Sequence, residues 1–156
     1  MATNIIRCAK PQEASFLSDL ALRSKGYWGY DSEFLSNCKK ELTYNESQIL
    51  SSNYSFKVAE SIEQHIVGFF ILDFTESKKP QLEALFIEPD FIGLGWGKRL
   101  LGAAISLAKQ RQAQCITLQS DPFAEDFYLA NGAKKVGSKE SHSIQGRFLP
   151  LLEICL

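Results

Sequence analysis

The passage from a strand to a helix between residues 82 and 108 constrains this chain more than any other segment. A strand-like run at 82–88 is followed by a turn with three glycines and then by an amphipathic helical pattern. The first turn of a helix presents unpaired N–H groups and the positive end of the helix dipole. The glycines, which let an anion approach that backbone without meeting a Cβ, are Gly93, Gly95 and Gly97. The segment therefore predicts a phosphate-binding turn.

The two common nucleotide-binding motifs do not fit this turn. A dinucleotide-binding turn requires GxGxxG, but Lys98 stands where its third glycine would fall. A Walker loop requires four residues between its glycines and Lys-Ser/Thr after them, whereas Gly93 and Gly97 enclose three residues and Arg99 follows the lysine. Lys98 still supplies a mobile positive charge close to the predicted phosphate.

Hydrophobic periodicity predicts one mixed α/β domain over residues 1–156. Strands at 56–60, 66–72 and 81–88, joined by short turns, predict an antiparallel meander. A strand follows the helix that begins after Gly97, so the crossover rule makes the two flanking strands parallel. The other predicted elements are a strand at 4–9, helices at 11–23, 31–41 and from 122 to Asn131, helical turns within 43–52, the strand after that crossover at 115–119, and strands at 134–138 and 147–155.

Composition narrows the classes of function. The 156 residues carry a net charge of -1, with 45% hydrophobic and 22% charged residues, which is typical of one globular domain and disfavours nucleic-acid binding. Four scattered cysteines and two histidines lack the spacing of a zinc site, so no metal is expected. With no signal peptide or membrane-length apolar run, we expect a cytoplasmic protein that binds no membrane.

Two segments resemble the GNAT superfamily of acetyl-CoA-dependent N-acetyltransferases. The family's Gln/Arg-x-x-Gly-x-Gly/Ala motif is similar to Ile92-x-x-Gly95-x-Gly97, which departs from it at Ile92. The family's Asn-x-x-Ala-x-x-Phe-Tyr segment is similar to 121–128, which begins with Asp121 and ends with Tyr128. The order of predicted helices and strands extends the resemblance over essentially the whole chain.

The resemblance implies a GNAT-like acyl-CoA N-acyltransferase fold. Its mostly antiparallel central sheet has helices on both faces, and a pair of parallel strands splays apart at the CoA cleft. By carry-over, the cofactor-binding residues for acetyl-CoA are Leu85, Phe86 and Ile87 along the pantetheine, Gly93, Leu94, Gly95, Trp96, Gly97 and Lys98 around the diphosphate, and Asp121. A backbone N–H within 85–87 is the expected oxyanion donor.

Tyr128 and Glu83 are the predicted catalytic residues. Tyr128 matches the family's tyrosine that protonates the departing thiolate, and the alternative is that its ring merely packs against the core. Glu83 is a polar residue in an apolar strand, on the face opposite Ala84 and Phe86, which suggests a base for the incoming amine. A solvent-facing residue or a structural ion pair is the alternative for Glu83, and Glu88 is the less attractive carboxylate.

The resemblance also locates the acceptor. Trp28 and Tyr30 lie in the loop where relatives contact the acceptor, although ordinary packing is the alternative, and Glu83 is expected to face it as well. The loop at 141–147, which contains His142, is expected to close over the acceptor.

The implied function is transfer of acetyl from acetyl-CoA to a primary amine of a small molecule or peptide, by direct attack in a ternary complex. The alternative is a non-catalytic acyl-CoA-binding module of the same fold. The apolar run at 148–152 would serve a homodimer as readily as a core strand.

Overall fold

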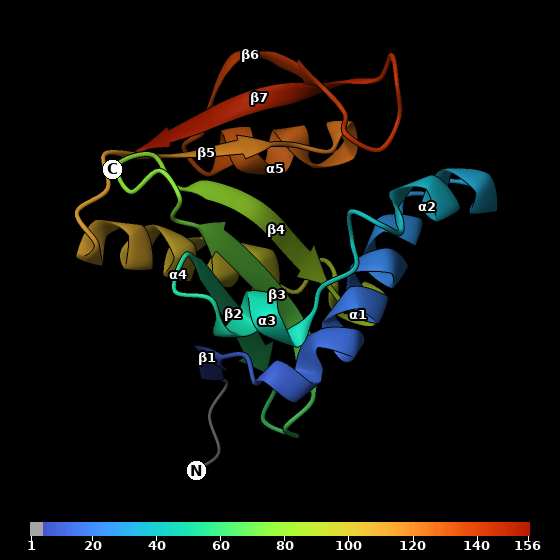
Figure 1. The fold of residues 1–156 in the computed structure, drawn as a ribbon, viewed down its shortest axis with the longest axis horizontal. Coiled ribbons are helices and arrows are strands. Elements are labelled where there is room, and N and C mark those ends of the chain that lie inside the picture. The colour runs from blue at the N-terminus through green and yellow to red at the C-terminus, as the bar shows by residue number, and fades with distance from the viewer. Residues whose placement is uncertain (1–4) are drawn as a thin grey trace.

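A computed structural model describes residues 5–156, so the predicted strand start at Asn4 lies outside the described residues. Seven strands form one mixed sheet in the order β1-β2-β3-β4-β5-β7-β6 (Figure 1). The strands are β1 (Ile5–Cys8), β2 (Tyr54–Glu60), β3 (Ile66–Asp73), β4 (Gln81–Ile87), β5 (Cys115–Gln119), β6 (Lys134–Glu140) and β7 (Phe148–Cys155). The predicted antiparallel meander is confirmed as β2, β3 and β4.

Five α-helices and three 3-10 helices complete the described fold. They are η1 (Pro11–Glu13), α1 (Ala14–Gly26), α2 (Ser32–Cys38), α3 (Glu46–Leu50), η2 (Pro89–Phe91), α4 (Trp96–Gln110), η3 (Pro122–Ala124) and α5 (Glu125–Ala130). Asp31 caps α2, because its carboxylate accepts a hydrogen bond from the N–H of Phe34. Two predicted helix ends are wrong by a few residues: α1 runs on to Gly26 and α2 ends at Cys38.

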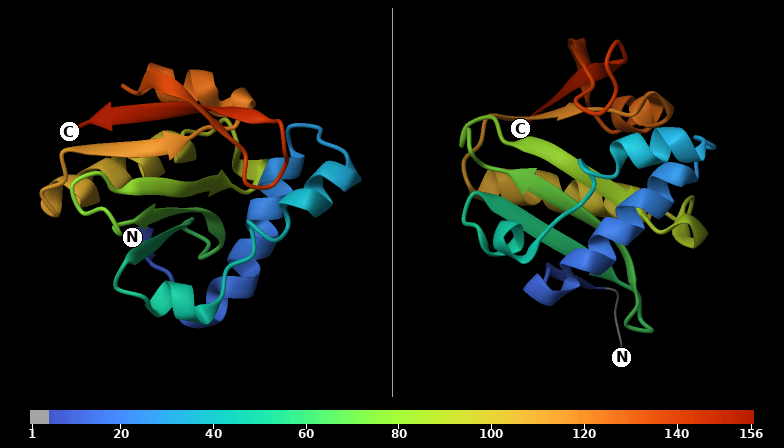
Figure 2. Two further views of the ribbon diagram at one scale, coloured as in Figure 1. Left: turned by 45° about the horizontal axis from the view of Figure 1, so that its top comes forward. Right: turned by 45° about the vertical axis from the view of Figure 1, so that its right-hand side comes forward.

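The central sheet is covered on both faces (Figure 2). One core lies between the sheet and α4, and a second core lies between the sheet and the helices α1 and α3. Strand β3 is buried on both sides, since Phe69 and Ile71 pack in the second core and Phe70 and Leu72 in the first. This placement accounts for the almost continuous apolar sequence of β3.

β4 and β5 are parallel, as the crossover through α4 requires, but they stay together for a single residue pair. That pair is Gln81 with Thr117, at the beginning of β4. Beyond it the two strands diverge, while β5 stays paired with β7 along its other edge. The sheet therefore opens along its middle, and the backbone of β4 loses its neighbour on one side.

A β-bulge in β4 turns Glu83 to a face that the alternation of the sequence did not predict. Ile71 of β3 pairs with Ala84 and Leu72 pairs with Leu82, which leaves Glu83 as the extra residue. A bulge places two successive residues opposite one residue of the partner strand and re-aims side chains. The prediction that Glu83 lies opposite Ala84 is therefore wrong, and Glu83 shares the face on which α1 and α3 pack.

The C-terminal hairpin places β7 between β5 and β6, an order that the sequence did not predict. β7 pairs antiparallel with both neighbours, and every residue of β6 at the sheet edge is exposed. The hairpin loop at 141–147 reaches back toward the segment between α1 and α3 (Figure 1). Within residues 5–156, no helix combines the length and the apolar composition needed to cross a bilayer.

Gly68 is required by the close packing of β3 against β4 and α4. A Cβ at this position would lie 2.8 Å from the main-chain oxygen of Phe86, 2.8 Å from Cδ1 of Ile87 and 3.0 Å from Cδ1 of Leu100. We expect Gly68→Ala to lower the free energy of unfolding by about 1–3 kcal/mol, because the backbone oxygen cannot move aside cheaply. Urea unfolding followed by circular dichroism measures this change.

Gly102→Ala is the matched control, because a Cβ on this residue of α4 meets nothing within 4 Å. That substitution should raise the free energy of unfolding by up to about 1 kcal/mol through helix propensity. A Gly68→Ala protein as stable as the parent would contradict the packing argument.

Candidate active site

One cavity of about 720 Å³ occupies the opening between β4 and β5. Its walls come from β4, the turn before α4, the end of β5, α1 and the loop at 141–147. A volume of this size is typical of a small-molecule site. Of the residues predicted for the site, the cavity is lined by Glu83, Leu85, Phe86, Ile87, Gly93, Gly95, Gly97, Lys98, Asp121, Tyr128 and Trp28.

The glycine-rich turn forms one end of this cavity. Gly93 and Gly95 adopt φ angles of 84° and 90°, a left-handed conformation that other residues adopt only with strain. A Cβ on Gly97 would approach the ring of Phe127 to 3.3 Å. Within residues 5–156, the main-chain N–H groups from Gly93 to Lys98 donate no hydrogen bond, so they are free to bind an anion.

Three side chains of this segment point in different directions. The indole of Trp96 is buried in the core beneath α4, with the guanidinium of Arg99 4.4 Å from its ring centroid. Leu94 is exposed and does not line the cavity. Trp96 and Leu94 are not among the lining residues, so only their N–H groups are left to act at this end, whereas Lys98 is a lining residue.

The backbone of β4 offers a second set of donors. Glu88 donates its N–H to Val67 beside β3, so the N–H groups of Ile87 and Leu85 point the other way, toward the opening. The N–H of Ile87 donates to Oγ of Ser24 in α1, at 3.3 Å. Since β5 has already diverged, the N–H of Leu85 faces the cavity without a strand partner, whereas that of Ile87 is engaged by Ser24.

Tyr128 lies in α5 with only 7% of its surface exposed, and it lines the cavity. Burial, and to a smaller extent the negative charge of Asp121, raises the pKa of this phenol above its ordinary value. The hydroxyl is therefore fully protonated at neutral pH and carries a proton that it can donate. Its ring packs edge-to-face on Phe127, so packing and a chemical role coexist in one side chain.

Glu83 also lines the cavity. The surrounding walls desolvate its carboxyl group, and this desolvation, together with the charges of Asp73 and Glu41, raises its pKa above the ordinary value. No ion pair or side-chain hydrogen bond partner is found for Glu83 within residues 5–156. Of the two alternatives for Glu83, the structural ion pair is therefore absent from the described residues, whereas the residue is exposed, as the solvent-facing alternative expects. Glu88 does pair with Arg23, at 2.6 Å.

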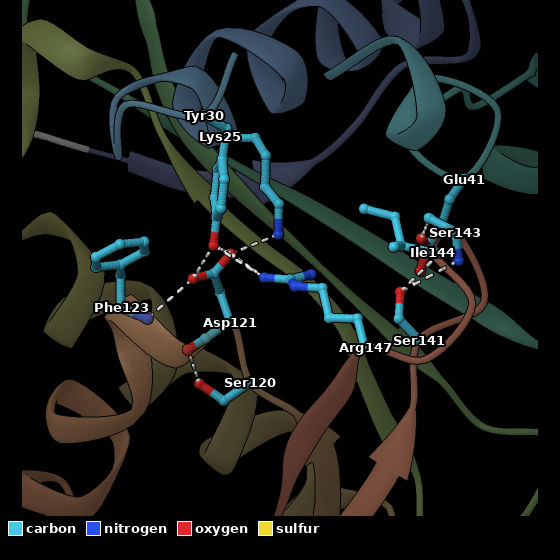
Figure 3. A network of polar contacts seen from close by, with 10 residues as sticks. All are labelled: Lys25, Tyr30, Glu41, Ser120, Asp121, Phe123, Ser141, Ser143, Ile144 and Arg147. Atoms are coloured by element: carbon cyan, nitrogen blue, oxygen red, sulfur yellow. Dashed lines mark hydrogen bonds and ion pairs between the residues drawn. The ribbon is translucent and has the colours of Figure 1, made fainter. Parts of the chain in front are cut away.

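Asp121 forms the centre of a polar cluster that joins α1, the end of β5 and the start of β7 (Figure 3). Lys25 contacts its carboxylate at 2.5 Å, Tyr30 donates a hydrogen bond at 3.0 Å, and Arg147 lies at 3.7 Å. Its other oxygen accepts a hydrogen bond from the N–H of Phe123, which caps η3. Burial would raise the pKa of Asp121, but the hydrogen bonds from Lys25, Phe123 and Tyr30 outweigh it and hold that pKa below its usual range.

Trp28 and Tyr30 differ in what they offer to the cavity. Trp28 lines it and stacks on Phe123 with ring centroids 5.5 Å apart. Tyr30 does not line it, because its ring stacks on Phe34 and its hydroxyl is held by Asp121 and Arg147. Burial and the charge of Asp121 raise the pKa of Tyr30 to about 12, so it acts as a donor in the cluster.

Sequence reasoning missed the side chains that line the cavity beyond Glu83. Glu41, Tyr44 and Tyr54 lie there, and Glu41 accepts a hydrogen bond from Ser143 of the loop at 141–147 (Figure 3). It also missed Lys25, the partner of Asp121. No local sequence pattern predicts these residues, because the fold brings them together from distant segments. In the sequence, the aromatic residues among them are indistinguishable from ordinary core residues.

The loop at 141–147 does meet the segment before α3, through Glu41 and Ser143, and His142 lines the cavity while remaining exposed. Among residues 5–156, no three His, Cys, Asp or Glu side chains are grouped so that they could hold a metal ion.

Comparison with known proteins identifies the family. A family model described as an acetyltransferase (GNAT) domain matches residues 13–145. Among solved structures, the PaiA N-acetyltransferase of Thermoplasma acidophilum, in complex with coenzyme A, superposes with a TM-score of 0.81 at 20% identity and covers 99% of both chains.

Two further structures have the same fold. A GCN5-related N-acetyltransferase of Rhodopseudomonas palustris gives a TM-score of 0.80 at 21% identity, over 100% of this chain and 98% of the other. The ribosomal-protein-S18-alanine N-acetyltransferase of Escherichia coli gives 0.72 at 16% identity, over 98% and 94%. No curated protein matches the sequence. The match of the family model over most of the chain, on a sheet that opens between β4 and β5, shows that this protein belongs to the GNAT family of acetyltransferases.

Proposed function

We propose that this protein transfers the acetyl group of acetyl-CoA to a primary amine. The observation that carries the proposal is the continuity of one cavity from the unpaired N–H groups of the glycine-rich turn, past the free N–H of Leu85, to the phenol of Tyr128. An anion-binding end, an oxyanion donor and a proton donor are the parts that acyl transfer from a thioester requires. Membership of the GNAT family agrees with this chemistry.

The residues of the cavity fit acetyl-CoA. The N–H groups from Gly93 to Lys98 and the Lys98 ammonium suit a diphosphate, and the unpaired edge of β4 suits the amides of a pantetheine arm. Ile92 supplies no polar group to this turn, so backbone donors carry the recognition. When bound, acetyl-CoA supplies an activated acetyl group with a thiolate as leaving group.

Bonds and protons balance within the cavity. The acceptor nitrogen forms a bond to the acetyl carbon as the carbon–sulfur bond breaks, so that one amide and one thiol result. Glu83 accepts the first proton that the ammonium form of the acceptor must lose, directly or through a water molecule, and passes it to solvent. Tyr128 donates a proton to the sulfur, while the N–H of Leu85 stabilises negative charge on the carbonyl oxygen. The second proton, which the nitrogen loses on becoming a neutral amide, returns to the Tyr128 phenolate, directly or through water.

The environment tunes both acid–base groups for these roles. A raised pKa makes the carboxylate of Glu83 a stronger base than an exposed glutamate. The raised pKa of Tyr128 makes the phenol a weaker acid, but the same desolvation acts on a thiolate in the cavity and makes it a stronger base. Transfer of the proton from phenol to sulfur therefore stays accessible.

Thiol release in the presence of an amine panel tests the proposed function. Acetyl-CoA alone should release thiol slowly, and an accepted amine should accelerate the release in proportion to the N-acetylated product found by mass spectrometry. Calorimetric binding of acetyl-CoA with no acceleration by any amine would favour the non-catalytic acyl-CoA-binding module instead.

Tyr128→Phe removes the phenol proton and keeps the buried ring. Because general acid catalysis typically contributes about 10²–10⁴-fold, we expect kcat to fall by roughly 10²-fold while the Kd for acetyl-CoA changes little. Steady-state kinetics and calorimetry measure the two quantities. Tyr27→Phe, at an exposed tyrosine outside the cavity lining, is the matched control and should leave both unchanged. Loss of acetyl-CoA binding in Tyr128→Phe would instead indicate a packing role.

Glu83→Gln removes the proposed base. Deprotonated Glu83 is the active form, so activity should fall as the pH drops through its pKa, and the raised pKa places that loss at a higher pH than for an ordinary glutamate. We expect the variant to lose this acidic limb of the kcat/KM profile and at least about 10² in kcat/KM at neutral pH. A variant that keeps the acidic limb would show that another group is the base.

A further inference from the structure

Charged side chains of both signs line the cavity. Lys25 and Arg147 line it beside Asp121 and are both engaged with its carboxylate. Glu83 and Glu41 also line it, and neither forms an ion pair with a cation among residues 5–156. Both residues are exposed, so two carboxylates without a paired protein cation are accessible from the same cavity.

An unpartnered hydroxyl in the same place adds an independent observation. Tyr44 has only 9% of its surface exposed, yet it lines the cavity, and no hydrogen-bond partner is found for its hydroxyl within the described residues. Because no buried side-chain polar atom among those residues lacks a partner, this hydroxyl is accessible from the cavity. Its ring is fixed edge-to-face against Phe56 and Phe69. Burial and the charges of Glu83 and Glu41 raise its pKa, which places the hydroxyl in the field of both carboxylates.

One ligand could satisfy this hydroxyl and the two carboxylates together. Two like charges that line one cavity repel each other. A donor-rich cation relieves this repulsion and gives the hydroxyl oxygen a partner, because an alkylammonium group has three N–H donors for carboxylate and hydroxyl oxygens. The aromatic ring of Tyr54, which also lines the cavity, suits the same kind of ligand.

We propose that the acceptor is a small amine with a second cationic nitrogen, which Glu41 and the hydroxyl of Tyr44 bind while the reacting nitrogen lies at Glu83. This inference rests on the proposed function and names the class of its substrate. The second nitrogen of an aliphatic diamine is protonated at neutral pH, so it carries the positive charge that the carboxylate of Glu41 can pair with. The contact between Glu41 and Ser143 places the loop at 141–147 next to the bound cation.

Three acceptors of similar length separate the possibilities. Butylamine has one nitrogen, 1,4-diaminobutane adds a second cation, and 4-aminobutanoate adds an anion at the same end. With acetyl-CoA saturating, we expect kcat/KM for the diamine to exceed that for butylamine by about tenfold, mainly through KM, and 4-aminobutanoate to be the poorest. Raising the salt concentration should reduce the preference for the diamine.

Two variants tie the preference to the named residues. Glu41→Gln removes the charge, and Tyr44→Phe removes the hydroxyl while keeping the ring. Each should lower the ratio of diamine to butylamine kcat/KM by at least about threefold, with an unchanged Kd for acetyl-CoA. Glu63→Gln, on the exposed turn between β2 and β3, is the matched control and should leave the ratio unchanged.

The outcomes distinguish this inference from the proposed function. Acetylation of butylamine and the diamine at equal rates, a preference for 4-aminobutanoate, or a ratio insensitive to both variants would overturn the dicationic acceptor and leave acetyl transfer intact. Efficient acetylation only of a peptide N-terminus would overturn it as well. Absence of acetylation with every amine, despite binding of acetyl-CoA, would overturn the proposed function itself.

Discussion

The parting of β4 from β5 after one residue pair is the constraint on which the site depends. A strand that stays paired with a parallel neighbour uses its N–H and C=O groups in hydrogen bonds between the strands. Here the pairing ends at Gln81 and Thr117, so the later groups of β4 face a cavity. The crossover through α4 begins at the same opening, which brings the unpaired N–H groups of a helix start to the end of the same cavity.

The opening is held in shape by polar contacts across it. Lys25, Tyr30 and Arg147 come from distant segments and meet at Asp121, and Glu41 meets Ser143 beyond them. Because the cations of this cluster, Lys25 and Arg147, contact Asp121, the carboxylate of Glu83 has no cationic partner among the described residues. This pairing sets the charges that line the cavity, and the proposed acceptor is inferred from those charges.

The sequence predicts the order of elements, because short strands, glycine turns and helix caps are local signals. The meander, the parallel pair and the lining by Leu85, Gly95 and Tyr128 follow from it together with the family resemblance. The sheet face on which the Glu83 side chain lies could not be predicted, because a bulge breaks the two-residue alternation on which that prediction rests. Tyr44 could not be assigned to the site either, because the sequence does not distinguish an aromatic residue that lines a cavity from one in the hydrophobic core.

Our account depends most on the claim that the main-chain N–H groups from Gly93 to Lys98 bind the diphosphate of a CoA thioester. A crystal structure of the protein with CoA tests this most directly. We predict diphosphate oxygens within hydrogen-bond distance of several of these N–H groups, and the pantetheine along the free edge of β4. A diphosphate bound elsewhere, with this turn in contact with solvent alone, would contradict the account.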